Sequence, residues 1–145
     1  MLLTLGLGYY WYKDVLPPAA QLDPRDAVVV QQGRELYAIH CATCHGVTLE
    51  GEPNWRTRGS NGMLPAPPHD ASGHTWHHPD ALLFQITKQG SEAMVGDGYE
   101  SDMIGFGKIL ADEEIIAVLS FIKSSWPSEV QLRHDEINNR AHAND

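Results

Sequence analysis

The chain has 145 residues, 42% of them hydrophobic and 8% aromatic, which is enough for one domain with extensions and excludes two ordinary domains. Its 19 acidic and 10 basic residues give a formal net charge of −9, which argues against nucleic-acid binding because that needs a basic surface. An acidic surface suits a partner with a basic face, or solubility alone. The chain has only two cysteines, which leave no disulfide framework.

Residues 1–12 form an uncharged, apolar segment that ends in four aromatic residues. The segment is shorter than the roughly 20 residues of a spanning helix, and it lacks the basic start of a complete secretory signal. Aromatic clusters of this kind settle at membrane interfaces. We predict a membrane anchor, or the outer end of one; a signal remnant or an apolar arm docked on a partner is the alternative. Residues 13–23 are predicted to be a linker, stiffened by two prolines.

The first helix is predicted to follow this linker directly. Asp23 is expected to be its N-cap and Pro24 its first residue, and the helix runs into Cys41. Gly33 and Tyr37 lie on or near one face of this helix at helical spacing.

Two further helices are predicted, with loops rich in glycine and proline around the earlier one. The earlier helix spans residues 79–89 and ends at Gly90. The later one begins with Asp112 as N-cap and ends before Pro127, which cannot continue it. Residues 128–145 are polar and are predicted to form a peripheral tail.

Residues 41–45 read Cys-Ala-Thr-Cys-His, the pattern of a c-type haem attachment site. Cys41 and Cys44 on one turn can add to the two vinyl groups of one porphyrin, and His45 can then bind the iron. A thioredoxin-like dithiol is one alternative, but it needs alternating strands and helices that the sequence does not show. A structural zinc site is another, but it needs two more ligands at suitable spacing.

A second axial ligand is expected among Met63, Met94, Met103 and the remaining histidines. Met103 is preferred, because it precedes the last helix in a segment with Gly105 and Gly107, where glycine allows the backbone to approach a haem face closely. A thioether ligand keeps the reduction potential high.

With these residues, the chain resembles the class I c-type cytochromes over residues 24–127. The matching positions, in chain order, are Gly33 with Tyr37, the 41–45 motif, Gly51 with Pro53, Met103 with Phe106, and the helix start at residues 110–115. The resemblance implies an all-α cytochrome c fold, with about three main helices and loops around one covalently bound haem c and its iron. It also implies that the first helix crosses the last one where Phe121 stands.

The resemblance further implies that the Pro53 carbonyl accepts a hydrogen bond from the second nitrogen of His45, which fixes the ring and strengthens it as a donor. The sequence departs from the family at two positions. Ile104 stands where proline often follows the ligand methionine, and Ala111 stands where serine or threonine often caps the last helix.

The stretch of residues 65–80 is rich in histidine and longer than the minimal family pattern. Its histidines suggest either a metal site, such as copper, or a docking face, but we expect them to hydrogen-bond loop backbone and the haem propionates. Trp76 is expected to pack at the haem edge. Trp55 and Arg56 are expected to lie near a propionate, because arginine binds carboxylates through two contacts. The four histidines concerned are His69, His74, His77 and His78.

Two protein ligands on a buried haem leave no open iron site, so the expected function is electron transfer rather than catalysis. The partners would be other redox proteins. The alternatives are a fixed haem subunit of a respiratory, photosynthetic or dehydrogenase complex, and a haem-based enzyme or gas sensor with an open iron site. The resemblance implies haem attachment outside the cytoplasm, hence a location on the periplasmic side of a bacterial inner membrane, anchored through residues 1–12.

Overall fold

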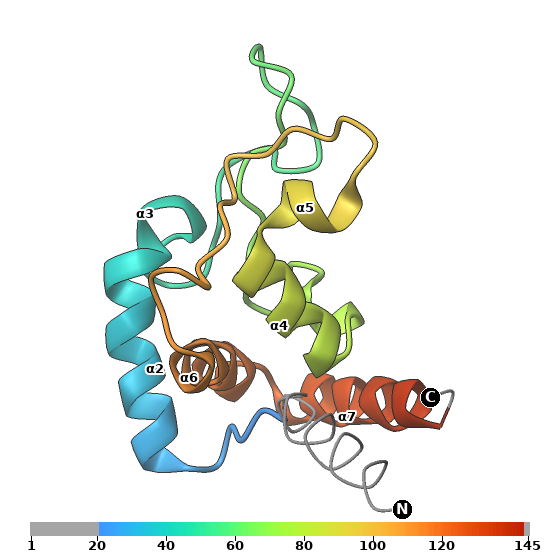
Figure 1. Ribbon diagram of the computed structural model, residues 1–145. Coiled ribbons are helices and arrows are strands. Elements are labelled where there is room, and N and C mark those ends of the chain that lie inside the picture. The colour runs from blue at the N-terminus through green and yellow to red at the C-terminus, as the bar shows by residue number, and fades with distance from the viewer. Residues whose placement is uncertain (1–20, 144–145) are drawn as a thin grey trace, which may run out of the picture.

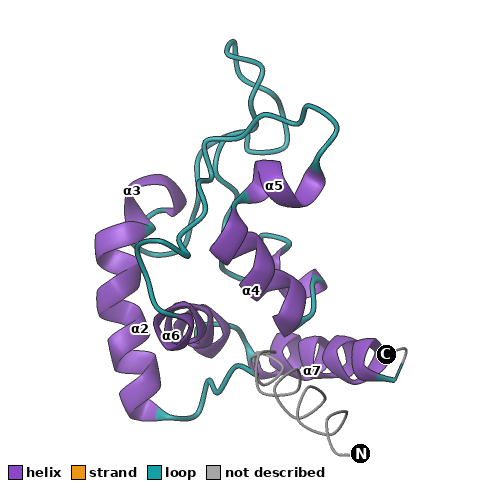
Figure 2. Ribbon diagram, viewed as in Figure 1, coloured by secondary structure: helices purple, strands orange, loops and turns teal. Residues whose placement is uncertain are grey.

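The computed structural model describes residues 21–143, so the anchor predicted at residues 1–12 and most of the predicted linker lie outside the described residues. The described part is helical and has no strand, which confirms the predicted all-α fold (Figures 1 and 2). No helix within it is long and apolar enough to cross a bilayer. The elements are α2 (Ala27–His40), α3 (Ala42–His45), the 3-10 turn η1 (Thr75–His77), α4 (Asp80–Gln89), α5 (Ser91–Val95), α6 (Asp112–Ser124) and α7 (Ser128–His142).

Helix α2 begins three residues later than the sequence suggested. Asp26 is its N-cap, and the Asp26 carboxylate accepts from the backbone N–H groups of Val28 (2.9 Å) and Val29 (3.2 Å). The predicted cap, Asp23, instead accepts from the N–H of Arg25 in the turn before the helix. The prediction was wrong because two aspartates three positions apart both suit a cap, and only the second lies where free helical N–H groups begin.

The crossing of α2 and α6 confirms the expected small-plus-aromatic pair. A Cβ at Gly33 would collide with the backbone carbonyl of Ala117, so only glycine allows this close approach. One turn later Tyr37 is 2% exposed, and its ring centroid lies 5.4 Å from that of Phe121. In Figure 1, α2 and α3 form the left side and α4 and α5 the right, with α6 viewed end-on between them.

Helices α4 and α6 begin and end close to the predicted residues. Helix α4 starts at Asp80 and ends at Gly90, whose φ of 90° is one that glycine adopts readily. Helix α6 is capped by Ala111 rather than by Asp112, and the Ala111 N–H donates to the Glu114 side chain at 2.8 Å. An alanine side chain cannot accept a hydrogen bond, so half of a capping box is missing here.

Most of the segment predicted as a polar, peripheral tail forms helix α7, and two polar side chains of this helix are buried against the domain. His134 is fully buried, and its Nε2 lies 2.9 Å from the His78 carbonyl oxygen. Asn138 is also buried, and its side-chain oxygen accepts from the N–H of Asp80 at 2.7 Å, at the first turn of α4. The low hydrophobic content of this segment gave no sign of a packed helix. Its buried polar side chains instead hydrogen-bond backbone groups of other elements.

Candidate functional site

The Cys-x-x-Cys-His sequence forms one turn where α2 passes into α3. The N–H groups of Cys44 and His45 both donate to the Cys41 carbonyl, at 3.2 and 2.9 Å. Both cysteines are free thiols, with Cys41 partly buried and Cys44 exposed. His45 ends the turn and is 6% exposed. The turn thus presents two thiols and one imidazole from a single short segment.

The His45 ring is oriented by a backbone carbonyl, although not by the one expected. Its Nδ1 donates to the Pro67 carbonyl oxygen at 2.9 Å. Pro53, the expected acceptor, is exposed and lies in a turn further out. The kind of contact was therefore predicted correctly, but the residue was wrong. With Nδ1 engaged as a donor, Nε2 carries the lone pair of the neutral ring and is the atom that can bind iron.

Backbone pairing brings Pro67 to this position. The N–H of Glu52 donates to the Ala66 carbonyl at 2.8 Å, and the N–H of Ala66 donates to the Glu52 carboxylate at 2.6 Å. Gly51 has a φ of 66°, and a Cβ there would lie 2.6 Å from the carbonyl carbon of Pro67. The predicted importance of Gly51 thus has a structural reason. Residues 53–65 form a long loop between the two paired segments, so spacing along the sequence indicated the wrong proline.

The pKa values in the turn follow from burial. Burial lowers the pKa of His45, while the hydrogen bond to Pro67 and the charge of Glu52 partly oppose this effect. The imidazole is therefore in the neutral form that metal binding needs. Burial, with a smaller contribution from Cys44, raises the pKa of Cys41 to about 11, so this sulfur is a thiol at neutral pH.

The segment that carries Met103 is fixed to the end of α4. The Met103 carbonyl accepts from the N–H of Ser91 at 3.2 Å, and the N–H of Phe106 donates to the Thr87 carbonyl at 2.9 Å. A Cβ at Gly105 would lie 2.6 Å from the backbone of α4. Met103 itself is partly buried against the hydrophobic core. The glycine noted in the sequence therefore allows close approach of two backbones.

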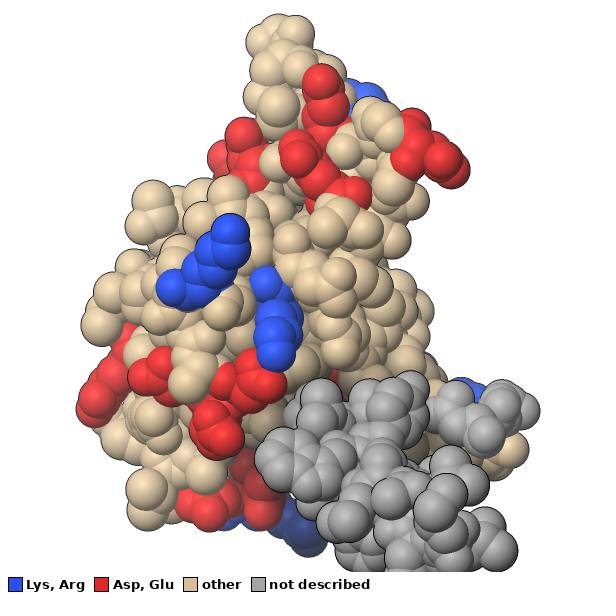
Figure 3. Space-filling model, viewed as in Figure 1, with Lys and Arg blue, Asp and Glu red and all other residues tan. Residues whose placement is uncertain are grey.

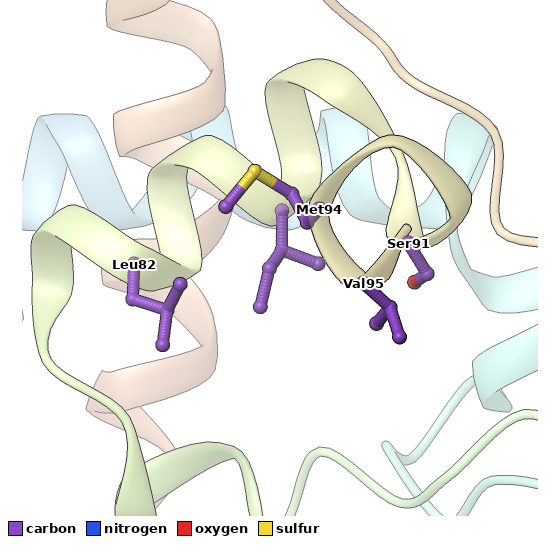
Figure 4. Close-up of a pocket in the computed structure, with 5 residues that line it drawn as sticks. Leu82, Ser91, Met94 and Val95 are labelled. Carbon is purple, nitrogen blue, oxygen red and sulfur yellow. The ribbon is translucent and has the colours of Figure 1, made fainter. Parts of the chain in front are cut away.

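The other two candidate methionines lie in different surroundings. Met94 lines an apolar hollow of about 250 Å³ between α4 and α5, which Figure 4 shows from close by. Met63 lies in a loop, where its carbonyl accepts from the N–H of Gly59 at 2.9 Å. The other residues of the hollow are Leu82, Ile86, Ser91 and Val95.

These features fit a covalently attached haem. Two free thiols share a turn with an imidazole whose Nε2 is free to bind iron. Met103 lies on a glycine-containing segment, partly buried against the core, and mainly apolar side chains line a hollow between α4 and α5. Soft sulfur and imidazole ligands together are the axial pair of high-potential haem proteins.

Of the four histidines in residues 65–80, His69 is the one whose ring contacts the 41–45 turn. His74 stacks on Trp55 with ring centroids 5.3 Å apart, and His77 lies 3.8 Å from Trp76 by the same measure. These are ring contacts rather than the backbone hydrogen bonds we expected. Within residues 21–143, no group of three or more histidine, cysteine or acidic side chains is placed to hold a metal ion.

The tryptophans predicted to lie near the haem are both partly buried. The Trp76 Nε1 donates to the Ala71 carbonyl at 3.3 Å. The Arg56 guanidinium lies 4.0 Å from the centre of the Trp55 ring, and Arg56 is otherwise exposed. Contact of these residues with the haem edge and propionates remains a prediction.

Acidic side chains gather on the surface around α5 and the loop that follows it (Figure 3). Glu92, Asp97, Glu100 and Asp102 are all exposed there. This arrangement agrees with the net charge of −9 and would attract a basic partner surface.

A helical domain that carries a Cys-x-x-Cys-His turn and a partly buried methionine on a glycine-containing loop has the parts of a c-type haem protein. The family model of cytochrome c matches residues 30–126, well over half of the chain, so the chain belongs to the cytochrome c family. Its cofactor is therefore covalently bound haem c with iron, and the family implies haem-based electron transfer. No curated protein and no solved structure matches the chain.

Proposed function

We propose that this protein is a single-haem cytochrome of class I that carries one electron at a time between larger redox proteins. The observation that carries the proposal is the 41–45 turn, with its two free thiols and with the His45 Nδ1 held 2.9 Å from the Pro67 carbonyl. Cys41 and Cys44 would hold the porphyrin through thioether bonds. His45 and Met103 would be the axial ligands.

Each residue of the site contributes to a rigid ligand set. Pro67 prevents rotation of the His45 ring and strengthens its donor nitrogen. Hydrogen bonds with α4 and α5 hold the backbone of the Met103 segment in place, so a ligand on this segment would not need to rearrange when the iron changes oxidation state. The bound haem iron supplies the change of oxidation state. Ligands that do not rearrange, and no open iron position, favour a carrier over an enzyme or gas sensor.

The membrane location is part of the proposal and rests on the uncharged, apolar residues 1–12, which end in four aromatic residues. Residues 22 and 23 fix the point at which the chain enters the domain. The N–H of Leu22 donates to the buried Asp80 carboxylate at 3.0 Å, and that of Asp23 to the Ser120 hydroxyl at 3.1 Å. The chain therefore enters the domain at a fixed point beside α7 (Figure 1). Residues 1–12 are the proposed anchor, on the periplasmic side of a bacterial inner membrane. Recovery of all the full-length protein in the soluble fraction without detergent would contradict the anchor.

The partners are proposed to be redox proteins with basic docking surfaces, because exposed acidic residues surround α5. A mobile carrier and a fixed subunit of a membrane complex have the same haem chemistry. Copurification from the native membrane distinguishes them, since a subunit stays stoichiometric through washing and a carrier is lost.

The ligand assignment is tested by comparing three variants of the haem-loaded protein: Met103→Ala, Met94→Ala and Met63→Ala. Only Met103→Ala should lose the weak long-wavelength absorption band of methionine-ligated ferric haem, and its reduction potential should fall. The other two should keep the band. Loss of the band in Met94→Ala alone would move the ligand to α5. High-spin spectra with ready carbon monoxide binding in the wild type would contradict the carrier function.

A further inference from the structure

His69 lies directly against the proposed axial histidine. The rings of His69 and His45 are stacked, with centroids 4.0 Å apart and planes at 26°. His69 comes from the same paired segment that supplies the Pro67 carbonyl. The His45 ring is therefore held by a hydrogen bond at Nδ1 and by another ring against its face.

His69 is itself held by several elements of the fold. Its Nδ1 lies 2.8 Å from the hydroxyl oxygen of Thr75, a buried residue. The backbone N–H of His69 donates to the Leu49 carbonyl at 2.8 Å, and the backbone carbonyl of His69 accepts from the Trp126 indole at 2.8 Å. The rings of Tyr37 and His69 also meet in a T-shaped arrangement, with centroids 6.4 Å apart. The two backbone bonds fix the position of His69 in the chain, and the contacts with Thr75 and Tyr37 restrict the plane of its ring.

We propose that His69 is a positioning residue for His45, which sets the plane of the axial imidazole and tunes the reduction potential of the haem. The inference rests on the proposed function of the 41–45 turn. Stacking restricts rotation of the His45 ring about its bond to Cβ, and the angle of that ring to the porphyrin determines how unpaired spin is distributed in the ferric state. The two nitrogens of His69 also make the surroundings of the ligand more polar, which favours the ferric form.

The test uses the full-length, haem-loaded protein with three substitutions: His69→Leu, His69→Phe and His142→Phe. Leucine removes the stacked ring, phenylalanine keeps a flat ring without nitrogens, and His142 is an exposed histidine in the last turn of α7. Redox titration gives the potential, and proton NMR of the ferric state gives the pattern of haem methyl shifts.

His69→Leu should raise the potential and change the methyl pattern. His69→Phe should raise the potential while keeping the pattern, and His142→Phe should change neither. Unchanged potential and pattern in both His69 variants would overturn the inference, even if their stability falls. If His69→Leu does not mature, the reduction potential of His69→Phe still tests the inference, and an unchanged value would overturn it. Thr75→Val, which removes the contact that holds the ring, should change the methyl pattern, and an unchanged pattern would contradict the positioning role. A wild type without haem would contradict the proposed function instead.

Discussion

The α2–α6 crossing and the loop of residues 46–79 are held by different kinds of contact. At the crossing, Gly33 and Tyr37 meet Ala117 and Phe121 through side-chain packing at helical spacing. In the loop, residues 49–52 pair with residues 66–69 mainly through backbone hydrogen bonds. Packing of the first kind leaves a pattern in the sequence, whereas backbone pairing leaves almost none.

The largest expected effect is at the crossing. Gly33→Ala places a methyl group against the Ala117 carbonyl, so the two helices must separate. We expect the free energy of unfolding to fall by about 3 kcal/mol, measured by denaturant titration of the haem-loaded protein. Gln32→Ala, at the exposed neighbouring position, should change stability by less than about 0.5 kcal/mol. Equal stability of the two variants would contradict the close approach.

The matching test in the loop is Gly51→Ala. The residue has positive φ, and its Cβ would meet the Pro67–Pro68 backbone, so stability should fall by about 2 kcal/mol. Because Pro67 orients His45, the reduction potential should change as well. Gly62 also has positive φ but faces open space, so Gly62→Ala should cost about 1 kcal/mol and leave the potential unchanged. An unchanged reduction potential in Gly51→Ala would show that the loop does not influence the axial ligand His45.

A smaller, pH-dependent effect is expected at α7. Burial lowers the pKa of His134, and Lys123 lowers it further, against the opposing effects of Asp80, the His78 carbonyl and Asp135. The unfolded chain therefore takes up this proton first, so the folded state loses stability as the pH falls below about 6.5.

His134→Gln should make the thermal unfolding midpoint less dependent on pH across this range. The wild-type midpoint should fall more steeply than that of the variant as the pH is lowered from neutral. Parallel curves for the two proteins would show that His134 does not contribute.

The smallest effect concerns the incomplete cap of α6. Ala111→Ser supplies the missing side-chain acceptor for the first turn, so stability should rise by about 0.5 kcal/mol in denaturant titration. Ser125→Ala, beyond the other end of the helix, removes a bond to the Ile122 carbonyl and should not raise stability. A loss of stability in Ala111→Ser would show that the N-terminus of α6 has no room for the hydroxyl.

The sequence was sufficient for the helices that carry regular apolar spacing and for the 41–45 turn. It was not sufficient for Pro67, because the acceptor is selected by backbone pairing across the loop of residues 53–65 rather than by distance along the chain. Helix α7 was missed because its buried positions, His134 and Asn138, are polar and resemble a solvent-exposed tail. The run of prolines at residues 65–68 was the only local sign that an extended segment lies there.

The central claim is that one haem is bonded through Cys41 and Cys44. Its most direct test is mass spectrometry of the peptide that holds both cysteines, from protein matured in a host that attaches haem c. The account predicts that this peptide carries the mass of one haem and that the double variant Cys41→Ser, Cys44→Ser carries none. An unmodified wild-type peptide, with both thiols still free to react with an alkylating reagent, would contradict it.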